Sequence, residues 1–164
     1  WYKDVRLVVY AVPPEGETGP TVTLDARFGA HIHLTGYALH APEPAHPGDA
    51  LTLSLFWRAD APTGARYKVF VHLLSEDGGI AAQHDGGPAG GLRPTTTWEA
   101  GETVTDNHGL LIPVHAAPGN YRLCVGLYRI DDPAERLPVF TEGESAGDSL
   151  PLATVDVEIV SSPR

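Results

Sequence analysis

The chain has 164 residues, enough for one domain with a sizeable core, and its 21 acidic and 11 basic residues give a formal net charge of −10. A surface of that sign repels phosphate backbones and anionic lipid headgroups, so the composition argues against nucleic-acid binding and against a polybasic membrane contact. The 18 glycines and 15 prolines stand mostly between short apolar runs, which is typical of turns that separate strands.

The first predicted element is a strand over residues 5–12, where side chains alternate along the chain. The segment Pro13–Pro20 cannot continue it, because proline lacks the backbone donor that a sheet needs. The chain starts at Trp1 and contains no methionine, so we expect it to be a piece of a larger protein. Residues 1–20 are expected to be a strand and linker from an upstream region, and residues 21–164 a single domain.

Further alternating segments predict strands at residues 31–39, 51–58, 67–74, 80–84, 104–112, 121–128, 137–140 and 154–159. Asp77-Gly78-Gly79 supplies a tight hairpin turn between two of them. No segment has a helical period. About nine short strands with turns between them predict an all-β fold, an antiparallel β-sandwich. The sequence PGNY at residues 118–121, ahead of a late strand, favours an immunoglobulin-like arrangement over the alternative, a jelly roll.

Two patterns raise the question of catalysis. Residues 143–147 (GESAG) match the GxSxG pattern of a serine nucleophile, but that chemistry needs a strand-to-helix turn, and polar loop and strand flank this serine. The second pattern is a set of side chains suited to acid–base chemistry, namely His72, His84 and His108 with Asp85 and Asp106. No nucleophile or second carboxylate at a definable distance accompanies them. We therefore expect satisfied polar contacts at a sheet edge and no catalytic residue.

A metal site is the next possibility, because His31 and His33 lie on one face of a predicted strand. The cupin pattern would need a glutamate where the chain has Tyr37, and a later PGxxxH that the chain lacks. Paired surface histidines on an edge strand are the expected alternative. The turn residues Asp77, Asp85, Asp131 and Asp132 do not follow the spacing of a known calcium loop. We expect no metal ion and no cofactor.

Aromatic side chains are the remaining candidates, because apolar sugar faces stack on exposed rings. The candidate ligand-binding residues are Trp98, Phe56, Phe70, His72 and Tyr128. The last four lie on the strand faces opposite the alternating core residues and would form one patch, unless the N-terminal strand or the Gly/Pro loop covers them. Trp98 lies in a loop and either plugs the end of the sandwich or stands exposed. Trp57 alternates with leucines and is assigned to the core.

Five segments occur in order between Pro47 and Val139: PGDALTLSLFWRADAPT, YKVFVHLLSEDG, QHDGGPAGG, RPTTTWEAGETVTD and PGNYRLCVGLY. Together they resemble a C-terminal module of bacterial multi-pass membrane proteins of the glycosyltransferase family 39 type, which are related to dolichyl-phosphate-mannose–protein mannosyltransferases. The opening WYKDVRLVVYAVP is similar to the segment that joins the membrane region to this module. The resemblance covers a little over half of the chain.

The resemblance implies a non-catalytic accessory domain on the extracytoplasmic face of a bacterial membrane, tethered to a glycosyltransferase-like parent. No catalytic residue can be carried over, because the family's membrane-embedded chemistry lies in segments that this chain does not contain. The expected partners are the upstream membrane region of the same protein and a glycan or cell-envelope polymer. A structural or protein-interaction scaffold domain without a small ligand is the alternative function, and an enzyme in its own right is the third.

Overall fold

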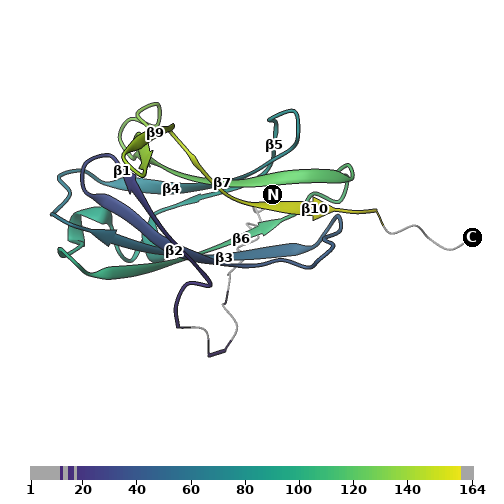
Figure 1. Cartoon of the computed structure of the whole chain (residues 1–164), viewed down its shortest axis with the longest axis horizontal. Helices are drawn as coiled ribbons and strands as arrows, with labels where there is room; N and C mark the ends of the chain where they lie inside the picture. The colour runs from purple at the N-terminus through teal and green to yellow at the C-terminus, as the bar shows by residue number, and fades with distance from the viewer. Residues whose placement is uncertain (1–11, 13–14, 17, 160–164) are drawn as a thin grey trace, which may run out of the picture.

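The structure is a computed structural model that describes residues 12, 15, 16 and 18–159, and it shows two β-sheets packed face to face (Figure 1). The strands in this part of the chain are β1 Val22–Phe28, β2 Ile32–His40, β3 Ala50–Ala59, β4 Tyr67–Leu74, β5 Ile80–Gly86, β6 Thr103–Leu111, β7 Gly119–Arg129, β8 Val139–Thr141, β9 Glu144–Gly147 and β10 Leu150–Val157. Two short 3-10 turns, η1 Pro88–Gly91 and η2 Thr95–Thr97, lie between β5 and β6. Within the described residues no helix has the length and apolar character to cross a membrane.

The strand order is β6-β3-β2-β1-β8-β9 in a six-stranded sheet and β10-β7-β4-β5 in a four-stranded sheet. Immunoglobulin domains place their last strands G and F beside C and C′ in one sheet, and the four-stranded sheet has this order. Within both sheets, all the pairings between these strands are antiparallel. The predicted all-β antiparallel sandwich is confirmed, with ten strands among the described residues where about nine were expected.

Tyr121, the third residue of β7, supports the immunoglobulin-like arrangement. Its side chain is buried, and its hydroxyl donates a hydrogen bond of 2.8 Å to the backbone carbonyl of Ala117. Many immunoglobulin-like domains have such a tyrosine near the start of strand F, bonded to the backbone a few residues upstream. The PGNY pattern in the sequence therefore marks a real structural feature, a tyrosine that ties the loop before β7 to the strand.

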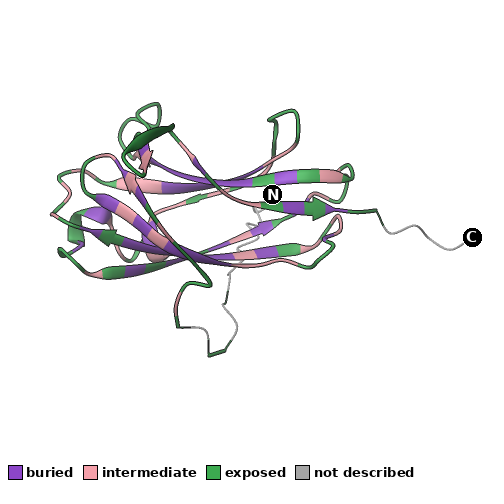
Figure 2. Ribbon diagram, viewed as in Figure 1, coloured by how far each residue is buried: buried purple, intermediate pink, exposed green. Residues whose placement is uncertain are grey.

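The core forms between the inward faces of the two sheets. Leu51, Leu53, Leu55 and Trp57 of β3 have at most 1% of their surface exposed, and Val69, Val71 and Leu73 of β4 have none. The middle of each strand is buried on both of its faces, at residues 53–57 of β3 and 69–73 of β4, and Figure 2 shows buried segments in the strands of both sheets. Each such aliphatic side chain stabilises the fold by about 1.5–3 kcal/mol relative to its exposed state. The assignment of Trp57 to the core is confirmed, and its ring packs edge-on against Phe28 at 5.2 Å.

Two strands of the structure, β1 and β9, were not predicted from the sequence. In β1 (VTLDARF) Leu24, Ala26 and Phe28 face the core, while Asp25 and Arg27 lie between them on the outer side, so the alternation is present but extends over only five residues. In β9 every residue is exposed, and the strand exists because it pairs with β8 as a hairpin. The GxSxG pattern falls on this hairpin, where a strand and no helix carries the serine. Of the predicted first strand, residues 5–11 lie outside the described residues.

Candidate functional site

Trp98, the first predicted ligand-binding residue, is buried. Only 2% of its surface is exposed, it belongs to the main core, and its indole Nε1 donates a hydrogen bond of 2.9 Å to the carbonyl of Arg93. The neighbouring Thr95 fixes the loop, because its hydroxyl bonds the Ala65 carbonyl at 2.8 Å and the Tyr67 amide at 3.1 Å, where β4 begins. Trp98 therefore plugs this end of the sandwich, and the prediction that it binds ligand is wrong.

The structure also places Phe56 away from the predicted patch. It points outward from β3, opposite Gly36 and Thr105, on the outer face of the six-stranded sheet. Only 7% of its surface is exposed, and Phe70 lies on the other sheet. Alternation along a strand shows which residues share a side, but it does not show which sheet the strand joins. Phe56 is therefore neither exposed nor part of the predicted patch.

Phe70, His72 and Tyr128 do come together, on the outer face of the four-stranded sheet. The Phe70 ring centroid lies 4.7 Å from that of His72 and 6.3 Å from that of Tyr128, which stacks on it at 26°. Phe70 lies flat over Gly126 of β7, where a Cβ atom would come within 2.1 Å of the ring. Phe70 and His72 are buried, while Tyr128 is partly exposed. Tyr128 is therefore the ring that a ligand can reach, and Phe70 supports it.

Two charged side chains complete this group. The Arg136 guanidinium carbon lies 4.6 Å from the centre of the Phe70 ring, and Asp85 Oδ1 lies 3.9 Å from His72 Nε2. We call Phe70, His72, Asp85, Tyr128 and Arg136 the Tyr128 face. Arg136 was not among the predicted site residues. It belongs to the loop between β7 and β8, and no pattern in that loop shows that it folds back on β7. An isolated antiparallel bridge between Tyr128 and Arg136 brings it there.

The protonation states of this face follow from its burial. Burial lowers the pKa of His72, Arg136 acts in the same direction, and Asp85 opposes both. Burial raises the pKa of the Tyr128 phenol, and the charge of Asp85 and a hydrogen bond to its carboxylate raise it further. At neutral pH the face therefore presents a neutral imidazole and a phenol, with one anionic and one cationic side chain beside them.

The other predicted acid–base residues lie inside the sandwich. The Nδ1 atoms of His84 and His108 are 2.8 Å apart, and His108 Nε2 lies 2.7 Å from Asp106 Oδ2. Asp106 also accepts the backbone N–H of Ala89 in η1 at 2.9 Å. His108 and Asp106 are each 1% exposed. These side chains join β5 to β6 across the edges of the two sheets, which agrees with the expected satisfied polar contacts and separates them from His72.

His31 and His33 share one carboxylate. Asp60 Oδ1 lies 2.9 Å from His31 Nδ1, Asp60 Oδ2 lies 3.4 Å from His33 Nε2, and Asp25 Oδ1 lies 3.0 Å from His33 Nδ1. The strand that carries His33 is β2, which lies between β1 and β3, so the expected edge position is wrong. Among the described residues no group of three or more His, Cys, Asp or Glu is arranged to hold a metal ion.

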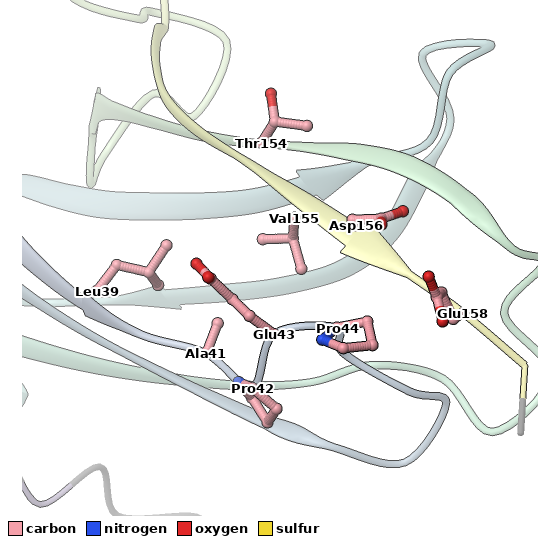
Figure 3. A pocket seen from close by; sticks show the side chains of 9 residues that line it. All are labelled: Leu39, Ala41, Pro42, Glu43, Pro44, Thr154, Val155, Asp156 and Glu158. Atoms are coloured by element: carbon pink, nitrogen blue, oxygen red, sulfur yellow. The ribbon is translucent and has the colours of Figure 1, made fainter.

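A groove that sequence analysis did not predict lies beside β10 (Figure 3). Its volume is about 350 Å³, and it is lined by Leu39, Ala41, Pro42, Glu43, Pro44, Thr154, Val155, Asp156 and Glu158. β10 is an edge strand, yet the Tyr37 hydroxyl bonds the Leu152 carbonyl at 2.7 Å and the Ala45 amide bonds the Asp156 carbonyl at 3.0 Å. These contacts occupy two backbone carbonyls of β10 that an added strand would otherwise use. Its residues come from distant parts of the chain, which explains why no sequence pattern revealed it.

Comparison with known proteins identifies the fold. No family model matches the chain, and no curated protein matches it by sequence. Among solved structures, the crystal structure of the C-terminal domain of Wzt is similar, with a TM-score of 0.55 and 13% sequence identity over 90% of this chain and 81% of that chain. At this identity the likeness shows a shared β-sandwich fold. Sequence comparison gives no support for the resemblance to the glycosyltransferase family 39 type.

Proposed function

We propose that this domain is a non-catalytic accessory module that binds a glycan or a sugar-bearing polymer of the cell envelope. The observation that carries the proposal is the Tyr128 ring, which is partly exposed, stacks on Phe70 and is bordered by Asp85 and Arg136. Sugar rings have apolar faces that pack on aromatic rings and hydroxyls that need donors and acceptors beside them. The Tyr128 face offers both.

The face is also held in place before a ligand arrives. Phe70 is fixed from below by the Gly126 backbone and covered by the Arg136 guanidinium, and Tyr128 stacks on its edge. A side chain that is already ordered loses little conformational entropy on binding, so more of the contact energy appears as affinity. This rigidity supports a binding role for a surface with only one reachable ring.

The carboxylates at the Tyr128 face support a non-catalytic role. Glycosidases of the common kind place two carboxyl groups on either side of the scissile bond, one as acid and one as base or nucleophile. Asp85 is the carboxylate beside Tyr128, and Asp148 lies at the edge of the face, where it is paired with the Arg136 guanidinium at 3.6 Å. The residues described here are therefore suited to holding a sugar, and the proposal assigns them no bond-breaking step.

The setting of the module is part of the proposal. The five segments that resemble the glycosyltransferase family 39 type support a membrane-tethered parent protein and an extracytoplasmic position. The scaffold alternative would favour a contiguous exposed apolar patch. The two most exposed large apolar side chains among the described residues are Leu92 and Val114, which belong to different loops, one before β6 and one after it. Glycan binding is therefore the better-supported function.

A glycan array probed with the isolated domain, followed by calorimetric titration with the glycan that binds most tightly, tests this proposal. Tyr128→Ala should weaken binding about tenfold, because a stacking contact contributes about 0.5–1.5 kcal/mol. Tyr128→Phe keeps the ring and should keep most of the affinity. Thr105→Ala, on the outer face of the other sheet, serves as the matched control. The proposal fails if no glycan binds, or if Tyr128→Ala binds as well as the unchanged domain.

A further inference from the structure

Tyr128 lies in a row with two cationic side chains. On β4 its register partner is Lys68, and on its other side the bridge to Arg136 places that residue opposite it. Directly opposed residues of antiparallel strands point to the same face of a sheet, with Cβ atoms about 4.5–5.5 Å apart. The row across the outer face is therefore cation, aromatic ring, cation, in a chain whose net charge is −10.

Nearby carboxylates do not neutralise these two positive charges through close ion pairs. Lys68 makes no ion pair with any residue that the structure describes, and Arg136 has one long contact, 3.6 Å from Nη1 to Asp148 Oδ2. Asp85 is engaged by Tyr128 and lies near His72. By contrast, Arg93 lies 2.6 Å from Glu102 and Arg129 lies 2.7 Å from Asp131. A surface-exposed cation without a close partner keeps its capacity to bind an anion.

Arg136 is also oriented for such a ligand. The guanidinium stands over the Phe70 ring, and this cation–π contact restricts its position. Arginine presents a planar set of N–H donors that matches the oxygens of a carboxylate or phosphate. The donors of Arg136 are therefore held beside the ring on which a sugar would stack.

We propose that the ligand of the Tyr128 face is an acidic glycan, in which a sugar ring stacks on Tyr128 and an attached carboxylate or phosphate lies against Lys68 and Arg136. This inference rests on the proposed glycan-binding function and narrows its substrate class. Because the domain has a net negative charge, its surface would repel an acidic polymer if the cations of this row were absent. Recognition then depends on short charge-assisted hydrogen bonds at the face, and salt should weaken it.

The test compares three oligosaccharides of equal length: a neutral one, one that contains uronic acid, and one that carries phosphate. Calorimetric titration in low salt should show at least about tenfold tighter binding of an acidic oligosaccharide than of the neutral one, and high salt should reduce the difference. Comparing the affinity for the uronic acid oligosaccharide with that for the phosphate oligosaccharide shows which acidic group the face prefers. Lys68→Gln should remove most of this preference by weakening the binding of the acidic oligosaccharides far more than that of the neutral one.

The control variant is Arg58→Gln, because Arg58 is an exposed arginine on β3, in the other sheet, and makes no ion pair with the described residues. It should leave all three affinities unchanged, which separates a local effect from a change in net charge. Arg136→Gln should also reduce the preference, and its thermal unfolding is measured alongside because Arg136 covers Phe70. If the neutral and acidic oligosaccharides bind equally and Lys68→Gln changes neither, the inference is overturned while glycan binding stands. If Tyr128→Ala has no effect on any of them, both proposals fail.

Discussion

The Nδ1 atoms of His84 and His108 lie 2.8 Å apart inside the sandwich, so one of these two ring nitrogens must donate a hydrogen bond to the other. Asp106 determines which one does. Its carboxylate lies 2.7 Å from His108 Nε2 and accepts the proton there, so in neutral His108 the Nδ1 atom is the acceptor. His84 therefore carries its proton on Nδ1. The chain Asp106–His108–His84 links the edge strand β5 of one sheet to β6 of the other.

Asp106 should contribute measurably to the stability of the fold. Asp106→Ala leaves the buried Nε2–H of His108 and the N–H of Ala89 without acceptors, so the free energy of unfolding should fall by about 1–3 kcal/mol. Asp106→Asn retains one acceptor oxygen and should lose less. Urea unfolding of both variants measures the difference. An Asp106→Ala domain as stable as the unchanged one would show that the network contributes nothing.

Stability should fall as the pH drops below neutrality, because of His84 and His72. Burial lowers the pKa of each, and a protonated His108 would lower the pKa of His84 further, while Asp106 and Asp85 oppose that shift. The unfolded chain takes up these protons near the ordinary histidine pKa of about 6.5, and the folded domain only at lower pH. The stabilisation is thus complete above about pH 6.5 and declines as the pH falls toward the folded-state pKa.

The measurement is the free energy of unfolding between pH 5 and pH 8, compared for the unchanged domain and for His84→Gln. The variant should show a shallower loss on the acid side, because it removes one of the two groups responsible. His115→Gln, a change at an exposed histidine in the loop after β6, is the control. Parallel curves for the unchanged domain and His84→Gln would contradict the assignment.

Gly126 should be intolerant of any side chain. A Cβ atom there would lie 2.1 Å from Cζ of Phe70, so Gly126→Ala must displace the ring and the Tyr128 ring that stacks on it. We expect a loss of about 1–3 kcal/mol in the free energy of unfolding and weaker glycan binding. Phe70→Leu in the same chain should recover part of the stability but not the binding. Additive effects of the two changes, measured in a double-mutant cycle, would argue against the contact.

Tyr121→Phe removes the hydroxyl that bonds the Ala117 carbonyl at 2.8 Å and keeps the ring in the core. The expected cost is about 0.5–1.5 kcal/mol of unfolding free energy, the usual net value of one such hydrogen bond. Tyr67→Phe is the matched control, because the Tyr67 hydroxyl makes no hydrogen bond with the described residues. Equal stability of the two variants would show that the bond before β7 has no measurable net effect.

Much of the fold was accessible from the sequence because it follows from local patterns. The alternation in β3 and β4 predicted the buried faces, and Asp77-Gly78-Gly79 predicted the turn in which Gly78 has a φ of +84°. β1 was missed although Leu24, Ala26 and Phe28 form a short alternating apolar face, and β9 was missed because none of its residues is buried. β9 forms only by pairing with β8, and no pattern in residues 144–147 predicts that pairing.

The candidate site depended on information that alternation does not contain. Phe56 and Phe70 have the same pattern in sequence, each outward from an apolar strand, yet they lie on the outer faces of different sheets. Arg136 reaches Phe70 only because the loop after β7 bridges back to Tyr128. The groove beside β10 likewise joins residues from β2, the loop after it and β10.

The sequence by itself determined that the domain is an all-β sandwich and that Trp57 is in its core. These follow from the period of two along a strand, which is a property of neighbouring residues. Only the tertiary structure decided that Trp98 is buried, that His84 meets His108, and that Lys68 and Arg136 flank Tyr128. Those contacts depend on which strands pair and on how the two sheets pack, and pairing is set by the chain as a whole.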